Sequence, residues 1–388
     1  MRDVVIVGAG PVGGALALAL ADTDLDIVAL DARAAGTTLR GDRSLALSHG
    51  ARLIFERLGV WPRLSSVAGA VTPIVEIDIS QAGGFGVTRL TAEEQGVPAL
   101  GYVVSYRALQ GAIDDALART RIGLRFGAAA TTVDATPARA AVTLAGAAQE
   151  TLMARLAVVA DGTGTAVAGI AREKRDYEQV ALIAKIRMER RHNGVAYERF
   201  TPEGPMALLP EGGNETDHYG LVWTMTPAKA EAVLALPDDR FLESLAHHFG
   251  TRVRGFVHVG ERRTFPLRLE FARPTTAMRS VVIGNAAQSL HPIAGQGFNL
   301  GVRDAWELGQ TIIRTPRDVL GDSPMLAAFA SRRRADRYAG IAFTHGLSQL
   351  FANDAALVRW PRGLALTVLD AVPPLKRAFT RAMLFGIS

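Results

Sequence analysis

The chain opens with Asp3-Val4-Val5-Ile6-Val7-Gly8-Ala9-Gly10-Pro11-Val12-Gly13-Gly14, and this stretch decides the fold. Its apolar first half predicts a buried β-strand, and its second half fits the pattern G-x-G-x-x-G. The residues from 15 to 21 are mostly Ala and Leu, which are strong helix formers. A second apolar strand is expected from Asp26 to Leu30, directly before Asp31. The expected order is strand, tight turn, helix, strand and acid.

Each part of this pattern has a physical purpose. Gly8 allows the sharp turn out of the strand, Gly10 lets the backbone approach a pyrophosphate, and Gly13 lets helix and strand pack closely. The helix N-terminus offers unpaired N–H groups and partial positive charge to phosphates. Asp31 follows about 20 residues later, where a carboxylate can accept hydrogen bonds from a ribose diol. The stretch predicts a dinucleotide-binding β-α-β unit, and its glycines and proline argue against a secretory signal peptide.

Composition narrows the remaining classes. The 388 residues are 48% hydrophobic and 21% charged, enough for a sizeable core in two domains. The absence of cysteine excludes disulfides and thiolate catalysis and suits a reducing cytoplasm. His247 and His248 are adjacent on an expected helix and face apart, so we predict no metal site. No run of eighteen residues is apolar without glycine breaks, so we predict no membrane-spanning helix.

The net charge of +5 is unevenly distributed. The segment from Arg332 to Ser388 holds nine Lys or Arg residues and three Asp or Glu residues. This basic region could contact anionic lipid headgroups or a partner protein, and the alternative is an ordinary solvated surface. We expect no nucleic-acid partner.

Hydrophobic periodicity gives a coarse order of elements. Helical spacing of apolar residues predicts a helix between Arg43 and Trp61, and alternation predicts a strand over 74–79. Short strands separated by Pro and Gly turns fill most of 176–279, which predicts a second, mainly antiparallel domain inserted into the first. Two further helices are expected near the C-terminus, interrupted at Pro373-Pro374.

A second glycine-rich stretch runs from Gly284 to Gly301 and reads GNAAQSLHPIAGQGFNLG. It follows an expected buried strand and opens an expected helix near Asn299, whose N-terminus would favour a phosphate or an anionic reduced flavin. A ligand long enough to touch both glycine-rich stretches fits extended FAD better than NAD. The alternative is a plain junction between loop and helix.

Three features together resemble the aromatic-ring hydroxylases, the flavin monooxygenases of the p-hydroxybenzoate hydroxylase fold. These are the G-x-G-x-x-G start, the mid-chain Asp161-Gly162, and a late Gly-Asn followed by P-x-x-G-x-G-x-N. Within that superfamily the chain is most similar to the ubiquinone-biosynthesis hydroxylases, in particular the 2-polyprenyl-6-methoxyphenol hydroxylase branch. The stretches that carry this similarity are 42–48, 160–163, 197–201, 207–210 and 290–301.

The resemblance implies an α/β fold with a Rossmann-like FAD-binding domain, an inserted antiparallel β-sheet substrate domain and a helical C-terminal region. We expect a discontinuous FAD-binding domain over 1–70, 101–175 and 280–330. The substrate domain would cover 71–100 and 176–279. The helical basic region would cover 331–388.

The resemblance also assigns roles to residues. Those expected to bind FAD are Gly8, Gly10, Gly13, Asp31, Arg43, Arg107, Asp161, Gly284, Asn285, Gly295, Gln296, Gly297, Phe298 and Asn299. Arg107 lies in the first turn of an expected helix, where a cation is unfavourable, and an anionic flavin nucleotide would explain it. The catalytic candidates are His291, Pro292 and Gly295. His291 could be the base for a phenol, and the alternative is a structural histidine.

The chain departs from the superfamily pattern at three places. Asn285 stands where Asp is usual, Gln288 replaces a frequent His, and Thr163 follows Asp161-Gly162 where a Ser is usual. The ubiquinone branch shares the first two changes, so they favour that subfamily.

The implied reaction uses FAD, NADPH or NADH as reductant, and O2 as co-substrate. O2 would form a C4a-hydroperoxide on the reduced flavin, and an electron-rich phenol would attack it and gain a hydroxyl. The substrate would be a lipophilic phenol, 2-polyprenyl-6-methoxyphenol, and the basic region would contact a membrane or a multi-enzyme assembly from the cytoplasm. The alternatives are a hydroxylase of a small soluble phenol, a flavin-dependent isoprenoid reductase and a non-catalytic nucleotide-binding protein.

Overall fold

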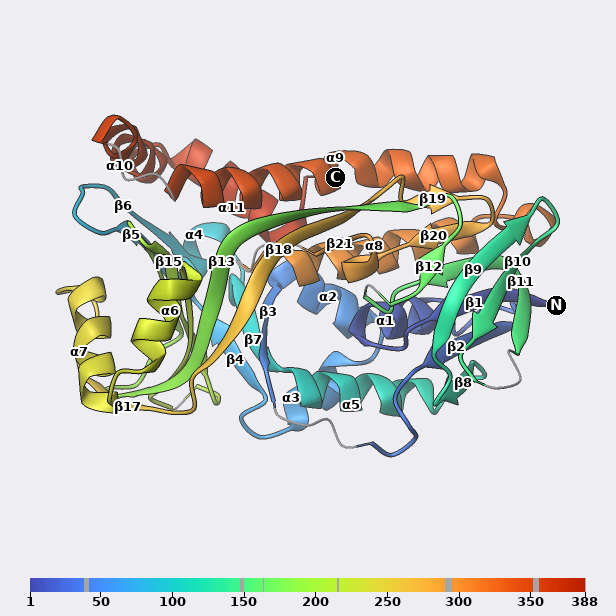
Figure 1. The fold of residues 1–388 in the computed structure, drawn as a ribbon, viewed down its shortest axis with the longest axis horizontal. Helices are drawn as coiled ribbons and strands as arrows, with labels where there is room; N and C mark the ends of the chain where they lie inside the picture. The colour runs from blue at the N-terminus through green and yellow to red at the C-terminus, as the bar shows by residue number, and fades with distance from the viewer. Residues whose placement is uncertain are drawn as a thin grey trace.

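The computed structural model describes residues 1–37, 42–146, 150–162, 164–214, 216–289, 295–351 and 356–387. Two large sheets lie at opposite ends of the molecule, and long C-terminal helices run along one side of both (Figure 1). The fold is α/β, as predicted. His291 and Pro292, two of the expected catalytic residues, lie outside the described residues.

The first sheet is built on β1 (Arg2–Val7). It pairs in parallel with β2 (Ile27–Asp31) and β11 (Thr151–Val159), and the outer parallel strands are β8 (Gly123–Phe126) and β20 (Ser280–Val282). These strands are apolar because helices cover them, with α1 (Pro11–Ala19) packed between α5 (Tyr106–Leu117) and α8 (Gln296–Ile313). The predicted strand, turn, helix and strand at the N-terminus are confirmed.

An antiparallel meander extends this sheet on the side of β11. It consists of β9 (Ala130–Thr136) and β10 (Arg139–Leu144), and the short β12 (Ala166–Val167) pairs with β9. β19 (Thr276–Ala277) pairs with β20 and completes the sheet.

The second sheet has the order β21-β18-β13-β16-β15-β14-β5-β6 and is antiparallel except where β14 meets β5. Its strands are β21 (Gln288–Ser289), β18 (Arg263–Arg273), β13 (Ala171–Met188), β16 (His218–Met225), β15 (Gly204–Glu211), β14 (Val195–Thr201), β5 (Glu76–Gln81) and β6 (Val87–Thr91), with β17 (Phe256–Val259) beside β13. Trp223 and Phe241 form part of the core between this sheet and the helices α6 (Pro227–Leu234) and α7 (Asp238–Phe249).

A small third sheet corrects one prediction. Residues 44–48 form a strand, β3 (Ser44–Ser48), and not the start of a helix; β3 pairs with β7 (Gly101–Ser105), which also pairs with β4 (Val71–Ile74). The helix α2 (His49–Arg57) begins only after Ser48, whose hydroxyl accepts a hydrogen bond from the Ala51 N–H at 3.2 Å. The apolar residues from 47 to 58 do fall at helical spacing. The stretch Ser44-Leu45-Ala46-Leu47-Ser48 also alternates with period two, however, and its pairing with β7 makes it a strand.

Two short helices, α3 (Trp61–Ser66) and α4 (Ala92–Gln95), flank this region. The C-terminal helices are α9 (Ser323–Phe351), α10 (Ala356–Ala371) and α11 (Pro373–Phe385), and the interruption at Pro373 is confirmed. α10 packs against the edge strand β6, and the Thr88 hydroxyl of β6 donates to the Leu366 carbonyl of α10 at 2.7 Å. Across the described ranges, no helix is both long and apolar enough to span a membrane.

Candidate active site

The turn between β1 and α1 is tightly packed on two sides and open on the third. Gly8 has a φ of +94°, and a Cβ there would lie 2.7 Å from the Asp161 Cα. A Cβ on Gly13 would lie 1.9 Å from the Gly8 carbonyl oxygen. A Cβ on Gly10 would meet no atom within 4 Å, and no side chain caps the helix that starts there. The backbone of this turn is therefore free to receive an anion at Gly10.

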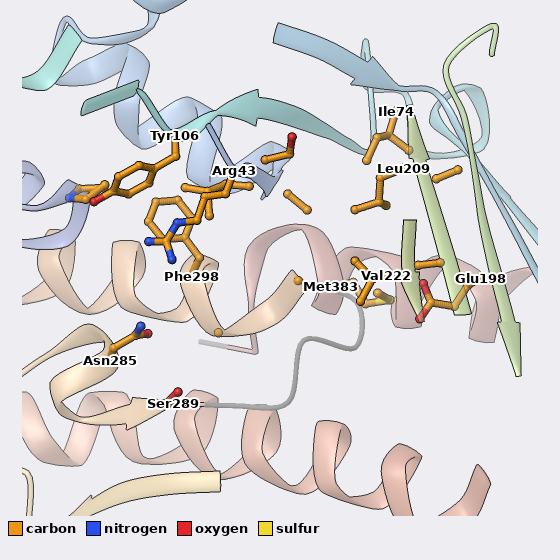
Figure 2. Close-up of a pocket in the computed structure, with 18 of the residues that line it drawn as sticks. Arg43, Ile74, Tyr106, Glu198, Leu209, Val222, Asn285, Ser289, Phe298 and Met383 are labelled. Carbon is orange, nitrogen blue, oxygen red and sulfur yellow. The ribbon is translucent and has the colours of Figure 1, made fainter. Parts of the chain in front are cut away.

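A cavity of about 810 Å³ begins at this turn and continues to the inner face of the second sheet. Figure 2 shows Arg43, Tyr106, Phe298 and Asn285 toward one side of it and Glu198 on the other. The apolar residues of the second half come from the second sheet and from α10 and α11, and they include Ile77, Leu209, Val222, Leu369, Phe379 and Met383. The cavity thus joins a polar glycine-rich half to an apolar half.

Asp31 lines the polar half, and its carboxylate is already engaged. Both its oxygens accept hydrogen bonds from Arg33, at 2.8 to 3.1 Å, and Arg33 also donates to Asp114 at 3.1 Å. Burial alone would lower the pKa of Arg33, but the two carboxylates raise it above its ordinary value. A ribose at Asp31 would share this carboxylate with a guanidinium.

The two arginines expected at the flavin nucleotide lie in different surroundings. Arg43 lines the cavity, with its guanidinium carbon 4.4 Å from the centroid of the Tyr106 ring. Arg107 is exposed and does not line the cavity, and its backbone N–H donates to Asp42 at 3.2 Å. The cation available inside the cavity near Tyr106 is Arg43.

The start of α8 forms another wall. Gly295 is its N-cap, with a φ of +59°, and Gly295, Gly297 and Phe298 line the cavity. Asn299 is buried, accepts a hydrogen bond from the Ser48 N–H at 2.8 Å and donates to the Gly295 carbonyl at 2.9 Å. Gln296 and Asn299 do not line the cavity. Asn299 therefore fixes the position of the helix start.

The short helix η1 (Gly284–Ala286) lies beside this wall. Gly284 has a φ of +61°, and a Cβ there would lie 3.0 Å from a methyl of Val12. Asn285 is exposed and lines the cavity. Gln288 is fully buried and donates to Asp304 at 2.9 Å, and Asp304 also accepts from Arg333 at 2.7 Å. Gln288 thus supports the wall from behind.

Glu198 was not among the site residues predicted from the sequence, although the stretch 197–201 carries part of the family resemblance. This residue lies on β14, lines the apolar half of the cavity, and burial raises its pKa to about 7. A signal was present, because Ala196, Glu198 and Phe200 alternate along one face of the strand and two of them are apolar.

The residues fit FAD on structural grounds. The open Gly10 would admit a pyrophosphate at the uncapped start of α1, and the uncapped start of α8 offers the same partial charge to a flavin ring. Asp161, whose side chain accepts a hydrogen bond from Thr165 at 2.6 Å, also lines the cavity, and its backbone packs against Gly8.

Comparison with known proteins agrees with this geometry. Residues 1–338 match the family described as FAD binding domain. The chain is 34% identical to ubiquinone hydroxylase UbiL of Rhodospirillum rubrum, over 98% of this chain and 89% of that protein. It is 28% identical to 3-demethoxyubiquinol 3-hydroxylase of Escherichia coli, over 97% of this chain and 96% of the relative.

A solved structure shows the same fold. The p-nitrophenol 4-monooxygenase PnpA of Pseudomonas putida matches all of this chain and 99% of its own, with a TM-score of 0.79 at 14% identity. FAD as cofactor, with the NAD(P)H and O2 typical of this class, is as the sequence predicted. The chain belongs to the FAD-binding monooxygenase family that includes these ubiquinone hydroxylases.

Proposed function

We propose that the protein hydroxylates the ring of a polyprenylated phenol in ubiquinone biosynthesis, with 2-polyprenyl-6-methoxyphenol as the expected substrate. The observation that carries this proposal is the apolar half of the cavity, which adjoins the walls expected to hold the flavin. Ile77, Leu209, Leu369 and Phe379 offer an isoprenoid chain a surface on which each buried CH₂ contributes about 0.8 kcal/mol. The names of the two ubiquinone relatives support the same substrate class.

The lining residues favour this substrate over a small carboxylated phenol. Such a phenol needs a cation near its ring. Among the described residues, the cations that line the cavity are Arg33 and Arg43, and both lie in the polar half, beside Asp31 and Tyr106. The apolar half has Glu198 as its charged lining residue, which would repel a carboxylate.

Each wall of the cavity would have a defined task. Bound FAD would supply the redox chemistry, which takes electrons from NAD(P)H and activates O2. Gly10 and the start of α1 would hold the pyrophosphate, Arg43 would balance its charge, and the start of α8 would face the flavin ring. The apolar half would exclude water and orient the phenol.

We also propose that α10 and α11 dock the protein on the anionic inner face of the membrane. One side of these helices contributes Leu366, Leu369, Phe379 and Met383 to the cavity. The opposite face of α10 exposes Leu364, which is 58% exposed, and Val368. Val372 between the two helices and Leu375 in the first turn of α11 are exposed as well. Arg377 and Arg381 are exposed on the same helical pair. Apolar side chains beside cations match an anionic lipid surface, from which a prenylated substrate could enter.

The test of the main proposal is the quinone lipid profile of an aerobically grown host that lacks this gene. We expect loss of ubiquinone with accumulation of a prenylated methoxyphenol, and recovery when the gene is restored. Accumulation of another prenylated ring would move the site of hydroxylation. A normal profile in a host without a redundant relative would contradict the proposal.

A further inference from the structure

Glu198 occupies the middle of the sheet face that forms the apolar half of the cavity. In the strand register it lies between Ile79 on β5 and Ala207 on β15, and Ala207 lies opposite Val222 on β16. All four of these residues line the cavity. A carboxylate therefore stands in a row of apolar side chains that crosses four strands.

The Glu198 side chain has no partner among the residues that the structure describes, unlike the buried acids Asp78 and Glu211 of the same sheet. Asp78 accepts a hydrogen bond from Arg252 at 3.1 Å, and Glu211 lies 3.8 Å from the Lys185 ammonium. The neighbouring Arg199 donates to the His248 carbonyl at 2.9 Å, outside the cavity. Glu198 is thus a carboxylate that lines the cavity and that no described side chain neutralises.

Among the described residues, the neighbours of Glu198 across the flanking strands are apolar. Ile79, Ala207 and Val222 come from the flanking strands, and Figure 2 shows Met383 of α11 on the same side of the cavity. The other charged lining groups, at positions 31, 33, 43 and 161, belong to the glycine-rich half. Desolvation is accordingly the cause that raises the pKa of Glu198, to about 7.

We propose that Glu198 binds the phenolic hydroxyl of the substrate and accepts its proton. This inference rests on the proposed function and adds the residue that activates the ring. The phenolic O–H bond breaks, the proton moves to a Glu198 oxygen, and the electron pair stays on the phenolic oxygen. The phenolate is a stronger carbon nucleophile than the phenol, and the resulting carboxylic acid returns the proton after hydroxylation.

The placement suits this task. The substrate ring would lie between β14 and the start of α8, with its hydroxyl toward Glu198 and its reacting edge toward the Phe298 wall. A base works best when its pKa is near the working pH, because it must be ionised to accept the proton and acidic enough to release it. An ordinary glutamate would be too weak a base.

Two variants separate binding from proton transfer. Glu198→Gln keeps a hydrogen-bond acceptor but cannot accept a proton, and Glu198→Leu removes both abilities. Glu211→Gln makes the same chemical change in the same sheet outside the cavity and is the matched control. The FAD content of each purified protein shows that it is folded and loaded.

The first readout is binding to the oxidised holoenzyme without NAD(P)H, followed by flavin fluorescence. The probes are a short-chain prenylated methoxyphenol and its methyl ether, which lacks the hydroxyl. Wild type and Glu198→Gln should prefer the phenol about tenfold, as expected for one hydrogen bond to a buried acceptor. Glu198→Leu should lose the preference, and an unchanged preference in this variant would overturn the proposal.

The second readout is turnover across pH. In Glu198→Gln, kcat should fall on the order of 10²-fold, and the acidic limb of the pH profile should disappear. A nitro-substituted prenyl phenol, which ionises unaided, should lose much less, and Glu198→Asp should recover part of the rate. A Glu198→Gln variant with the kcat of wild type and an unchanged acidic limb of the pH profile would overturn the proposal. If wild type hydroxylates no prenyl phenol, the proposed function fails, while the binding comparison still tests Glu198.

Discussion

Gly13 packs so closely against Gly8 that a Cβ on Gly13 would lie 1.9 Å from the Gly8 carbonyl oxygen. Gly10 lies between them in sequence, and a Cβ there would meet nothing within 4 Å. Its φ of −63° also suits any residue. The packing of the protein requires glycine at positions 8 and 13. It does not require glycine at position 10, where a side chain would have room in the absence of a ligand.

Gly10→Val should therefore abolish FAD retention and leave the apoprotein folded. The Val side chain would occupy the space through which a pyrophosphate approaches the backbone. The measurement is the flavin absorbance of the purified protein together with urea unfolding of the apoprotein, where we expect a change of at most ~1 kcal/mol.

Two glycines serve as controls for this prediction. Gly13→Ala should reduce the free energy of unfolding of the apoprotein, because the methyl collides with the Gly8 backbone. Gly111→Ala, at an exposed helical position with open space around it, should leave FAD binding intact. A yellow, fully loaded Gly10→Val protein would refute the assignment of this turn.

Asn299→Ala should lower the free energy of unfolding by ~2–3 kcal/mol. The substitution leaves the buried Ser48 N–H without its acceptor, and the Gly295 and Ala46 carbonyls lose the amide that donates to them. Chemical denaturation measures the effect. Asn285→Ala, at an exposed cavity position on η1, is the control and should leave the unfolding free energy nearly unchanged. Equal costs at the two positions would contradict this account of Asn299.

Arg333→Ala should be strongly destabilising, by ~3–5 kcal/mol. Arg333 is buried and donates to Asp304 and Asp336, both at 2.7 Å. Its removal would leave two buried carboxylates without the cation that lies between them. Burial alone would raise the pKa of Asp336, but Arg303 and Arg333 hold it below its ordinary value. Arg240→Ala breaks an exposed pair with Glu243 and should cost less than ~1 kcal/mol by the same urea measurement.

Glu198 should make stability depend on pH. Its pKa is about 7 in the folded protein and 4.5 as an ordinary glutamate, so the folded state binds more protons between these values. The penalty of a buried charge is absent below pH 4.5 and complete above pH 7. Glu198→Gln should thus be more stable than wild type at pH 8, by up to ~3 kcal/mol, and nearly equal at pH 4.5. A difference that does not change with pH would contradict the burial of this charge.

The docking surface of α10 and α11 predicts a charge-dependent interaction with lipid. The double substitution Val368→Asp and Leu375→Asp should reduce co-sedimentation with anionic phosphatidylglycerol vesicles at least tenfold, because it replaces two exposed apolar side chains of α10 and α11 with carboxylates. Val67→Asp, at a residue 48% exposed after α3, is the control and should have no effect. Sedimentation equal to wild type in the double variant would favour a solvated surface or a protein partner.

The sequence sufficed where structure is determined locally. The glycines of the first turn and the break at Pro373 each follow from a constraint on a few neighbouring residues. It failed at β3, because the choice between strand and helix depends on pairing with β7, more than fifty residues away. The division into domains and the roles of the residues at 291 and 292 stay predictions.

The candidate site was predictable in part for the same reason. The glycine-rich walls carry motifs, so Gly10, Arg43 and Gly297 could be named in advance, and all three line the cavity. Arg107 lies outside because its helix presents it to solvent. The alternation of Ala196, Glu198 and Phe200 put Glu198 on an apolar strand face, but its apolar surroundings depend also on Ile79 and Val222, from strands far apart in the chain.

The most direct test of the central claim is the incorporation of ¹⁸O from ¹⁸O₂ into a prenylated phenol. The purified FAD-loaded protein is incubated with NADH or NADPH, ¹⁸O₂ and a short-chain 2-polyprenyl-6-methoxyphenol, and the product is analysed by mass spectrometry. We expect one ¹⁸O atom in the product, on the ring, and none in incubations without the nicotinamide. Oxidation of NAD(P)H without labelled product, or saturation of the prenyl chain without oxygen incorporation, would contradict it.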